Sequence, residues 1–427
     1  MAAPSPPDPT GVRLYGWRHP SVIAAAVFSA YAGFAQFSAT AALPDIAAAF
    51  GAQDTAGDSI AAQVGLSGTT LGIGLAIIRL ASIASLPMAR QADRHGRKRV
   101  LLTTSAIALV LTALAAGSPT FWLLVVILAL ARPLMSATNA VAGVIAAEEV
   151  AAADRSKALA VITVGYGVGA GLPVALRGLT DGAISFRTLF LLAIPLLLTL
   201  TLAGRLVREP DRAARLAADT TGAAKRLGTV PPSLRGRLWL MAVLTFFVAF
   251  LTGPVNTYLF VYAENVAGVS PGLLAIVIPA AGAMGAAGLV LGVRLADRFG
   301  RIPTAMWAKF ALAGAAVLTY SAGAWGAITG YVLTLFIGSS YAPAVAATAA
   351  EIFPTSIRAT AAGWLTFAGT IGAVVGLLLF GWVADAAGSF AVAAWVVSVP
   401  VAISTIGYRF LPETRGMELE DSAPEVA

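Results

Sequence analysis

The chain has 427 residues, of which 58% are hydrophobic and only 11% are charged, and its mean hydropathy is +0.83. A water-soluble domain carries roughly 25% charged residues, so this chain lacks the polar surface that would cover a soluble core. The absence of cysteine excludes disulfides, thiol catalysis and thiolate metal sites. The pI near 9.9 comes from basic residues scattered over many short loops, which argues against a nucleic-acid-binding domain.

In chain order, the sequence begins with a proline-rich stretch, 1–20, that lacks the basic start and cleavage site of a signal peptide. Twelve apolar stretches follow, each near the length of about twenty residues that a helix needs to cross a bilayer. Because lipid-exposed backbone must be satisfied within its own helix, we predict an all-α integral membrane fold with twelve transmembrane helices. The spans are expected at 21–43, 61–88, 100–117, 121–146, 157–177, 188–206, 238–262, 272–295, 302–322, 326–350, 358–384 and 390–410.

The distribution of Lys and Arg predicts the orientation, because cytoplasmic loops carry an excess of both. With the N-terminus inside, the outer loops hold only Arg177 and Arg187. Both termini are therefore expected in the cytoplasm, and the longest break falls after the sixth span. The predicted organisation is a disordered cytoplasmic tail at 1–20, a six-helix bundle at 21–206, a cytoplasmic linker at 207–237, a second six-helix bundle at 238–411 and a cytoplasmic tail at 412–427.

Two sequence signatures recur in the two halves. "DRHGR" at 93–97 returns as "DRFGR" at 297–301. A glutamate stands seven residues before an arginine at 148–155, and the same spacing returns at 351–358. Both recurrences have an offset close to 203 residues, which indicates two parallel six-helix repeats, an architecture of alternating-access transporters.

These residues resemble the major facilitator superfamily over roughly 20–415. The family's loop motif is matched by Asp93, Arg94, Gly96, Arg97 and Lys98, although Ala89 and Val293 replace its first glycine in the two copies. "ARPLMSATNA", which contains Arg132, and "FRTLFLLAIP" at 186–195 are similar to drug–proton antiporters. "EIFPTSIRATAAG" and "LPETRGMELED" are similar to the sugar-porter and organic-ion branches.

The resemblance implies a secondary transporter that moves a small organic solute by alternating access. We expect a monomer in the cytoplasmic membrane, with the solute and the lipid bilayer as its partners and no nucleic acid. No enzyme activity is expected, since the spans contain no paired acids, metal ligands or nucleophile constellation. The spans also suggest no cofactor or metal site, and the proton is the expected coupling ion if there is one.

The charged loops at the inner side are the predicted gate. Arg94 and Arg97 can pair with Glu148, Glu149 or Asp154 on the next inner loop, and such pairs close one side of a transporter and break when it opens. The alternative is that these cations only keep the loop in the cytoplasm. The predicted gating residues are Asp93, Arg94, Gly96, Arg97, Glu148, Glu149, Arg155, Asp297, Arg298, Gly300, Arg301, Glu351 and Arg358.

Two arginines, Arg79 and Arg132, lie near the middle of predicted spans, where an arginine costs at least about 2.5–3.5 kcal/mol. They are therefore expected to face a cavity, and helical spacing places each on a polar face. Alternatively, both only bond backbone carbonyls at packed interfaces. The predicted substrate-binding residues are Arg79, Arg132, Ser136, Asn139, Gln36, Tyr31, Asn256, Tyr258, Tyr262 and Tyr341.

No carboxylate lies at the same depth. Asp45, Glu264 and Asp385 are near outer span ends, and the other acids are near inner ends, in loops or in tails. A buried carboxylate is the usual proton carrier, so its absence leaves facilitated diffusion, anion exchange, or coupling through an acid near a span end. Export of a drug-like or secreted metabolite is favoured by the stretch around Arg132. Uptake or exchange of an organic anion or nutrient is the alternative, and a non-transporting receptor is a third class.

Overall fold

The computed structural model describes residues 16–51, 59–151, 154–209 and 230–417. Within these ranges the side chains of a few helical residues lie outside the description, among them the predicted gating residues Asp93 and Arg94. The predicted tails and linker lie largely outside the described residues. The described residues form helices without strands, and twelve helical stretches are long and apolar enough to cross a membrane.

The described residues of the first half form a series of helical segments. They are α1 (Pro20–Ala41), α2 (Leu43–Phe50), α3 (Ile60–Val64), α4 (Gly68–Ala81), η2 (Ser82–Ala84), α5 (Ser85–His95), α6 (Arg97–Ala115), α7 (Phe121–Glu148), α8 (Arg155–Leu179), α9 (Phe186–Leu191) and α10 (Ala193–Leu206). The short segment η1 (Gly16–Arg18) precedes them.

The second half repeats this plan. Its helices are α12 (Pro232–Val261), the π-helical turn η4 (Tyr262–Val266), α13 (Pro271–Phe299), α14 (Arg301–Ser321), α15 (Gly323–Glu351), α16 (Thr355–Ala387), α17 (Phe390–Ser404) and the 3₁₀ segment η5 (Thr405–Phe410). Helix α12 begins six residues before the start that the sequence predicted, inside the range assigned to the linker.

The second predicted span, 61–88, is interrupted near its start. The backbone turns at Gly65, whose φ of +103° suits only glycine. Ser67 then caps a new helix, because its side chain accepts the N–H of Thr70 at 3.1 Å. The stretch that crosses the membrane therefore runs from Gly68 to Met88. The prediction missed the break because the residues on both sides of it are apolar.

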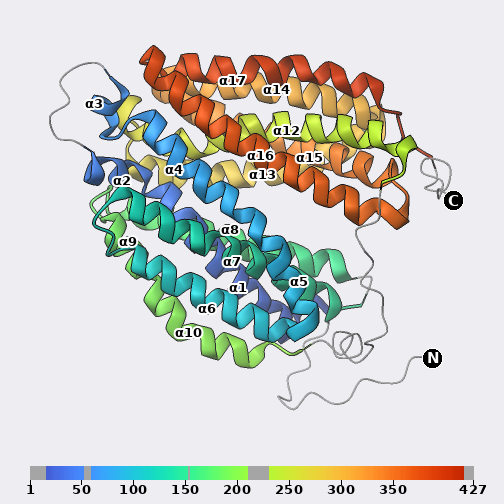
Figure 1. Ribbon diagram of the computed structural model, residues 1–427, viewed down its shortest axis with the longest axis horizontal. Coiled ribbons are helices and arrows are strands. Elements are labelled where there is room, and N and C mark those ends of the chain that lie inside the picture. Colours follow the sequence, from blue (N-terminus) through green and yellow to red (C-terminus); the bar gives the residue numbers. More distant parts are fainter. Residues whose placement is uncertain (1–15, 52–58, 152–153, 210–229, 418–427) are drawn as a thin grey trace.

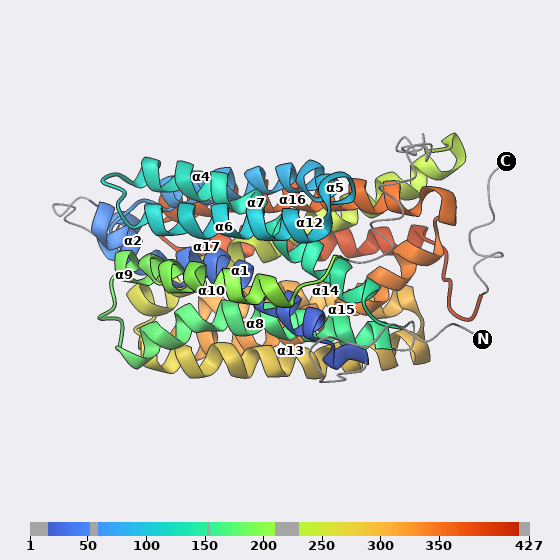
Figure 2. The same cartoon turned by 90° about the horizontal axis from the view of Figure 1, so that it is seen from below.

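The two halves use equivalent helix contacts. In the first half α1 packs against α8 and α6 packs against α7, and in the second half α12 packs against α16 and α14 against α15. Glycine allows the closest of these approaches: Gly169 faces the carbonyl of Ala30 in α1, and Gly376 faces that of Phe250 in α12, with no room for a Cβ. Figure 2 shows the helices of the first half running side by side along the molecule.

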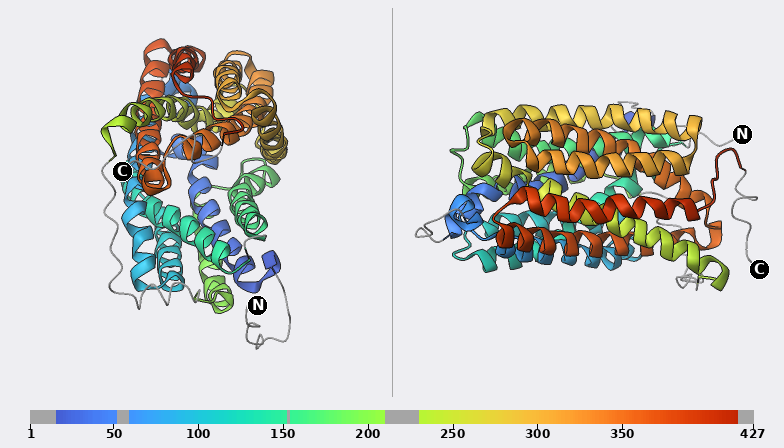
Figure 3. Two further views of the ribbon diagram at one scale, coloured as in Figure 1. Left: turned by 90° about the vertical axis from the view of Figure 1, so that its right-hand side faces the viewer. Right: turned by 90° about the horizontal axis from the view of Figure 1, so that it is seen from above.

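The halves lie next to each other with their helices nearly parallel (Figures 1 and 3). The most extensive contacts between them are those of α4 with α16 and of α8 with α13. We call the end that carries α2 and α3 the far end, and the end that carries the two Asp-Arg-x-Gly-Arg loops the motif end. Every hydrogen bond and ion pair that links described residues of different halves lies at the far end.

Candidate functional site

Arg79 in α4 and Arg132 in α7 lie at the same depth. Each stands eleven residues from the far-end start of its helix, Gly68 or Phe121, which is about 16 Å at ~1.5 Å per residue. Among the described residues neither guanidinium forms a hydrogen bond or an ion pair, and the Nε atom of each is buried without a partner. Each interacts electrostatically with Tyr166, and the charge of Arg79 acts on Arg132.

Tyr166 in α8 completes this constellation and was not among the predicted residues. Its hydroxyl donates to Oε1 of Gln36 in α1 at 3.1 Å, which leaves the hydroxyl oxygen and the amide nitrogen of Gln36 free for other partners. We call Arg79, Arg132, Tyr166 and Gln36 the arginine site. Tyr166 stands within the glycine-rich stretch 165–171, where a single tyrosine gives no local signal of a binding role.

The face of α4 that carries Gly68, Gly72 and Arg79 has two roles: its glycines pack against α16 and its arginine belongs to the arginine site. Gly68 and Gly72 do not line an open pathway but allow α16 to approach. A Cβ on Gly68 would lie 2.8 Å from the carbonyl oxygen of Gly381, and one on Gly72 would lie 2.7 Å from that of Leu377. Arg79 lies on this same face, two turns further along, and therefore faces the second half of the molecule.

Two other predicted residues of the first half are engaged inside their own bundle. Asn139 accepts a 2.5 Å hydrogen bond from Ser29, which is fully buried between α1 and α7. The Tyr31 hydroxyl lies 2.8 Å from that of Thr199 in α10. Ser136, one turn after Arg132, is half-buried and has no hydrogen bond of its side chain among the described contacts.

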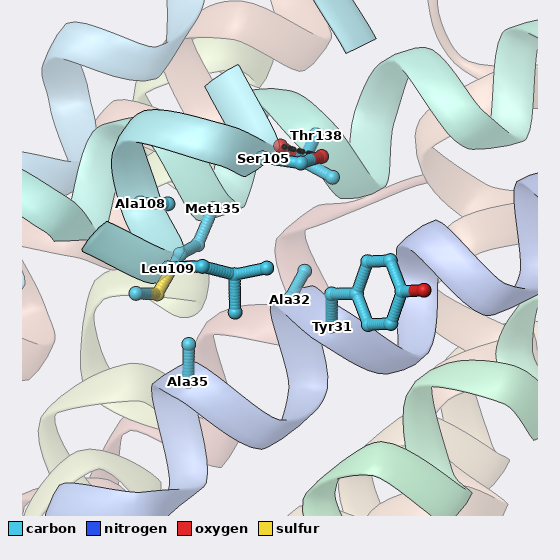
Figure 4. A pocket seen from close by; sticks show the side chains of 8 residues that line it. All are labelled: Tyr31, Ala32, Ala35, Ser105, Ala108, Leu109, Met135 and Thr138. Atoms are coloured by element: carbon cyan, nitrogen blue, oxygen red, sulfur yellow. Dashed lines mark hydrogen bonds between the residues drawn. The ribbon is translucent and has the colours of Figure 1, made fainter. Parts of the chain in front are cut away.

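Tyr31 also lines a void inside the first bundle, between α1, α6 and α7 (Figure 4). Its walls are mainly Ala, Leu and Met side chains, with Ser105 and Thr138 at one edge. The hydroxyls of Ser105 and Thr138 are 3.3 Å apart and satisfy each other. No water molecule fits in this void, so it is a packing space and not the cargo site.

The tyrosines predicted for the second half are packed. Tyr258 donates to the carbonyl of Gly68 at 2.8 Å, a contact between the halves. The ring of Tyr262 lies 4.9 Å from that of Tyr320, and the Tyr341 hydroxyl lies 2.5 Å from that of Tyr408. In contrast, Oδ1 of Asn256 is buried without a partner. Asn256 is therefore the predicted residue of the second half with an unused polar atom.

One buried cation, Lys309, was not among the residues predicted from the sequence. Lys309 in α14 is fully buried, and its Nζ donates to the carbonyl of Leu244 at 3.2 Å. The same Nζ lies 5.5 Å from the ring centroid of Tyr408. Lys309 stands eight residues after Arg301 in α14. It lies inside the second bundle and forms no described contact with the arginine site.

At the motif end, the same network occurs in each half. Arg97 pairs with Glu148, and Arg301 pairs with Glu351 at 3.2 Å. Arg301 also contacts Asp297 at 3.2 Å. These pairs connect helices within one bundle and do not themselves join the halves. They are formed although no polar contact between described residues links the halves at this end, and the prediction that they break when this end opens stays a prediction.

A second carboxylate completes each network and was not predicted. Glu209 accepts the N–H groups of Arg97 and Lys98 at 2.6 and 2.8 Å. Glu413 accepts those of Arg301 and Ile302 at 2.9 and 3.0 Å. Each carboxylate thus satisfies free N–H groups at a helix start and lies at the positive end of the helix dipole.

The loop glycines make this arrangement possible. Gly96 and Gly300 have φ of +90° and +106°, and both face the capping carboxylate. A Cβ on Gly300 would lie 2.6 Å from Oε2 of Glu413. The glycine of the motif is therefore required by both the backbone conformation and the available space.

The remaining predicted gating residues have contacts within their own half. Glu149 lies 3.6 Å from Nδ1 of His19, and Nε of Arg155 donates to the carbonyl of Ala147 at 3.1 Å. Arg358 bonds the carbonyl of Phe353 at 3.4 Å, and Arg298 lies 5.3 Å from the ring centroid of Phe299. A gating role for these residues stays a prediction.

At the far end, Arg177 joins the two halves through charge. Its guanidinium donates to both carboxylate oxygens of Glu264 at 2.8 and 3.0 Å and to Oδ1 of Asp45 at 3.1 Å. It also bonds the carbonyl of Ala41. Arg177 and Asp45 belong to the first half and Glu264 to the second. We call Arg177, Asp45 and Glu264 the far-end cluster.

A second far-end contact uses Asp385 of α16. Its carboxylate accepts the N–H groups of Gly68 and Thr69 at 2.7 Å each, and the Thr69 hydroxyl at 2.5 Å. The carboxylate thus caps the start of α4 from the other half. Together with the far-end cluster, this contact holds the two halves together at the far end.

The described residues contain no group of three or more His, Asp or Glu side chains that could hold a metal ion. The carboxylates at both ends are instead bonded to guanidinium or backbone N–H groups. The site that the structure assembles is therefore one of unpartnered donors on Arg79 and Arg132, with amide and hydroxyl groups beside them.

Known structures share this fold. The inward-open xylose transporter XylE of E. coli matches with a TM-score of 0.72 at 16% identity, covering 94% of this chain and 98% of that one. A bacterial homologue of the human lysosomal transporter Spinster also gives 0.72 at 16% identity, covering 91% and 96%. The human organic anion transporter MFSD10 gives 0.64 at 16% identity, covering 91% and 99%.

No curated protein sequence matches the chain. The family model of the Major Facilitator Superfamily matches residues 23–337 and 285–425, which together include all twelve spans from α1 onwards. With the repeated loop motif and the paired six-helix bundles, this match identifies the chain as a multi-pass membrane transporter that belongs to the Major Facilitator Superfamily.

Proposed function

We propose that this transporter carries a small organic anion, which Arg79 and Arg132 hold in the arginine site. The observation that carries the proposal is that two guanidinium groups lie at one depth within the spans without a carboxylate partner among the described residues. The cargo supplies the missing negative charge, and alternating access moves it across the cytoplasmic membrane.

Electrostatics supports this class of cargo. An unpaired charge inside a membrane protein is costly, and two like charges that act on each other raise the cost. A carboxylate or phosphate relieves it, because guanidinium presents a planar fork that binds such groups with two parallel hydrogen bonds. Tyr166 and Gln36 add a hydroxyl and an amide that can orient the rest of the molecule.

The charges of Arg79 and Arg132 also favour one transport cycle, anion exchange, over the others. Occluding an empty site would bury both charges without a counter-ion, whereas occluding a loaded site would not. Return with a second anion is therefore easier than return empty, and anion exchange follows as the preferred cycle. MFSD10, which shares the fold, is itself described as an organic anion transporter.

Export of a drug-like or secreted metabolite anion is the preferred direction, because the stretch around Arg132 resembles the antiporters of drugs. Uptake of an anionic nutrient is the second candidate, and the absence of a buried acid beside Arg132 favours it over a proton-driven drug pump. In both cases the Lys and Arg distribution places the motif end in the cytoplasm.

A thermal-shift screen of the purified protein tests the proposal. The probes are benzoate, succinate, citrate and glycerol phosphate, with xylose and tetraethylammonium as neutral and cationic controls. We expect an anion to raise the Tm of the wild type. Arg132→Ala should weaken the apparent affinity by roughly 1.5–3 kcal/mol, because a charge-assisted bond is lost.

Arg132→Lys is the matched variant, because it keeps the charge and loses the fork, so it should bind the anion less tightly than the wild type. The Tm of each variant without ligand separates a loss of binding from a loss of stability. A best ligand that is a permanent cation, or an unchanged anion affinity in Arg132→Ala, contradicts the anion site.

A further inference from the structure

The far-end cluster contains more negative than positive charge. One guanidinium, that of Arg177, serves two carboxylates, Asp45 and Glu264. Asp45 and Arg177 belong to the first half and Glu264 belongs to the second, so opening the far end separates Glu264 from the Arg177–Asp45 pair. A proton bound to one carboxyl in the closed state would leave one positive and one negative charge.

The burial of the cluster makes this imbalance costly. The Arg177 side chain is 4% exposed and that of Glu264 is 11% exposed. Glu264 uses both its oxygens on Arg177, but Asp45 uses only Oδ1. Its Oδ2 is buried and has no hydrogen-bond partner among the described residues. A buried carboxylate oxygen without a donor is unfavourable when charged, and a proton on it removes that cost.

We propose that the far-end cluster is a proton-sensitive latch, which binds one proton when the far end closes and releases it when the far end opens. The proton enters and leaves from the same side, so it is not carried across the membrane. Its effect is to bias the carrier between its two orientations. This inference goes beyond the proposed cargo and does not depend on it.

The direction of the effect follows from Asp45. Burial raises the pKa of this carboxyl above its ordinary value of 3.8, although the charge of Arg177 acts to lower it. In the open state the carboxyl is hydrated and its pKa returns towards the ordinary value. The closed state therefore binds the proton more tightly, so lower pH stabilises closure and higher pH favours opening.

The other titratable groups near this end do not balance the cluster. Tyr262 precedes Glu264 by two residues, and a tyrosine is neutral between pH 5 and pH 9. Tyr258 on α12 donates to the carbonyl of Gly68. Asp181 on the loop after α8 and Asp385 on α16 are further acids, and neither has a described bond to Arg177. The segments α3, and the first turn of α13, carry no charged residue. Residues 52–58, with Asp54 and Asp58, lie outside the described residues.

The second far-end contact provides a matched control. Asp385 also joins the halves, but both of its oxygens accept hydrogen bonds from α4 and it has no described bond to Arg177. Asp385→Asn should therefore weaken closure without removing its dependence on pH.

The absence of cysteine allows site-specific labelling without other changes to the chain. Thr180, just after α8, and Ala387, at the end of α16, are exposed far-end residues of different halves. Spin labels on Thr180→Cys and Ala387→Cys, in protein reconstituted in nanodiscs, report the opening of this end by pulsed EPR. The same pH on both faces makes the orientation of the protein irrelevant.

In the labelled chain, we expect the fraction of molecules with a long distance between the two spin labels to grow as the pH rises from 5 to 9. Asp45→Asn leaves a balanced Arg177–Glu264 pair, so this variant should stay closed and lose the pH dependence, whichever carboxyl carries the proton. Glu264→Gln should open and also lose it, whereas Asp385→Asn should open and keep it. A labelled chain without pH dependence, or an Asp45→Asn variant that keeps it, overturns the proposal.

Discussion

Three cations lie away from the ends of the described spans, and their surroundings differ. Lys309 donates to a backbone carbonyl and lies near an aromatic ring, which is a solution for a charge that only has to be tolerated. Arg79 and Arg132 have neither, and their Nε atoms are unpartnered. The alternative that they bond backbone carbonyls at packed interfaces fits Lys309 and does not fit the two arginines.

The glycine of each Asp-Arg-x-Gly-Arg loop, Gly96 or Gly300, can be tested by substitution. Gly300→Ala places a Cβ against Glu413 and forces a side chain into a left-handed backbone conformation, which costs roughly 1–2 kcal/mol. We expect a lower Tm for Gly300→Ala and for Gly96→Ala, measured by differential scanning fluorimetry in the same detergent.

Gly314, in the middle of α14, is the control for this experiment. A Cβ there meets no atom within 4 Å, and the backbone is helical. Gly314→Ala should leave the Tm unchanged or raise it, because alanine favours the helix. Equal losses at Gly300 and Gly314 would show that the glycines matter only for general packing.

Single residues were predictable where the chemistry was local. Arg79 and Arg132 could be found because an arginine in an apolar stretch is exceptional. The partners of Arg177 could not be found, because Glu264 is 87 residues away and in the other half. A sequence shows that a residue is charged, but which surfaces meet depends on the conformation of the whole molecule.

At the scale of the element, helix starts are capped differently at the two ends. At the far end, side chains of the chain just before a helix do this, as Ser67 does for α4 and Ser270 for α13. At the motif end, α6 and α14 are capped by Glu209 and Glu413, which follow the last helix of each half. These caps therefore fix the sixth helix against the third in both repeats.

Removing one of these carboxylates tests that role. Glu413→Gln keeps an acceptor and loses the charge at the helix start, which should cost roughly 0.3–1 kcal/mol. Glu413→Ala removes the acceptor as well and should cost about 0.5–2 kcal/mol. Thermal unfolding of both variants should show this order. A higher stability of Glu413→Ala than of Glu413→Gln would contradict the capping role.

Most elements could be predicted because each span is long and apolar. The exceptions have physical reasons. Gly65 breaks the second predicted span through a backbone angle that hydropathy does not register. Helix α12 begins early because Pro232 starts a helical turn with charged residues that extends beyond the apolar stretch. The offset of the repeated motifs was visible, but the capping role of Glu209 and Glu413 was not, although Glu413 lies in the stretch "LPETRGMELED" that resembles sugar porters and organic-ion transporters.

At the scale of the molecule, the two halves hold together at one end. Arg177 with Glu264, Asp385 with the start of α4, and Tyr258 with Gly68 all join them at the far end. Among the residues described, the motif end has no equivalent contact, and its ion pairs stay within each bundle. The described contacts therefore represent a state in which the far end is closed.

Counterflow in proteoliposomes tests the central claim most directly. Vesicles preloaded with the anion that gives the largest thermal shift are diluted into the same anion carrying a radiolabel. We expect transient accumulation of label with the wild type, and none with Arg132→Ala reconstituted to the same level at an unchanged Tm. Equal accumulation by the variant, or accumulation of labelled tetraethylammonium or xylose instead of the anion, would contradict an anion transporter built on Arg79 and Arg132.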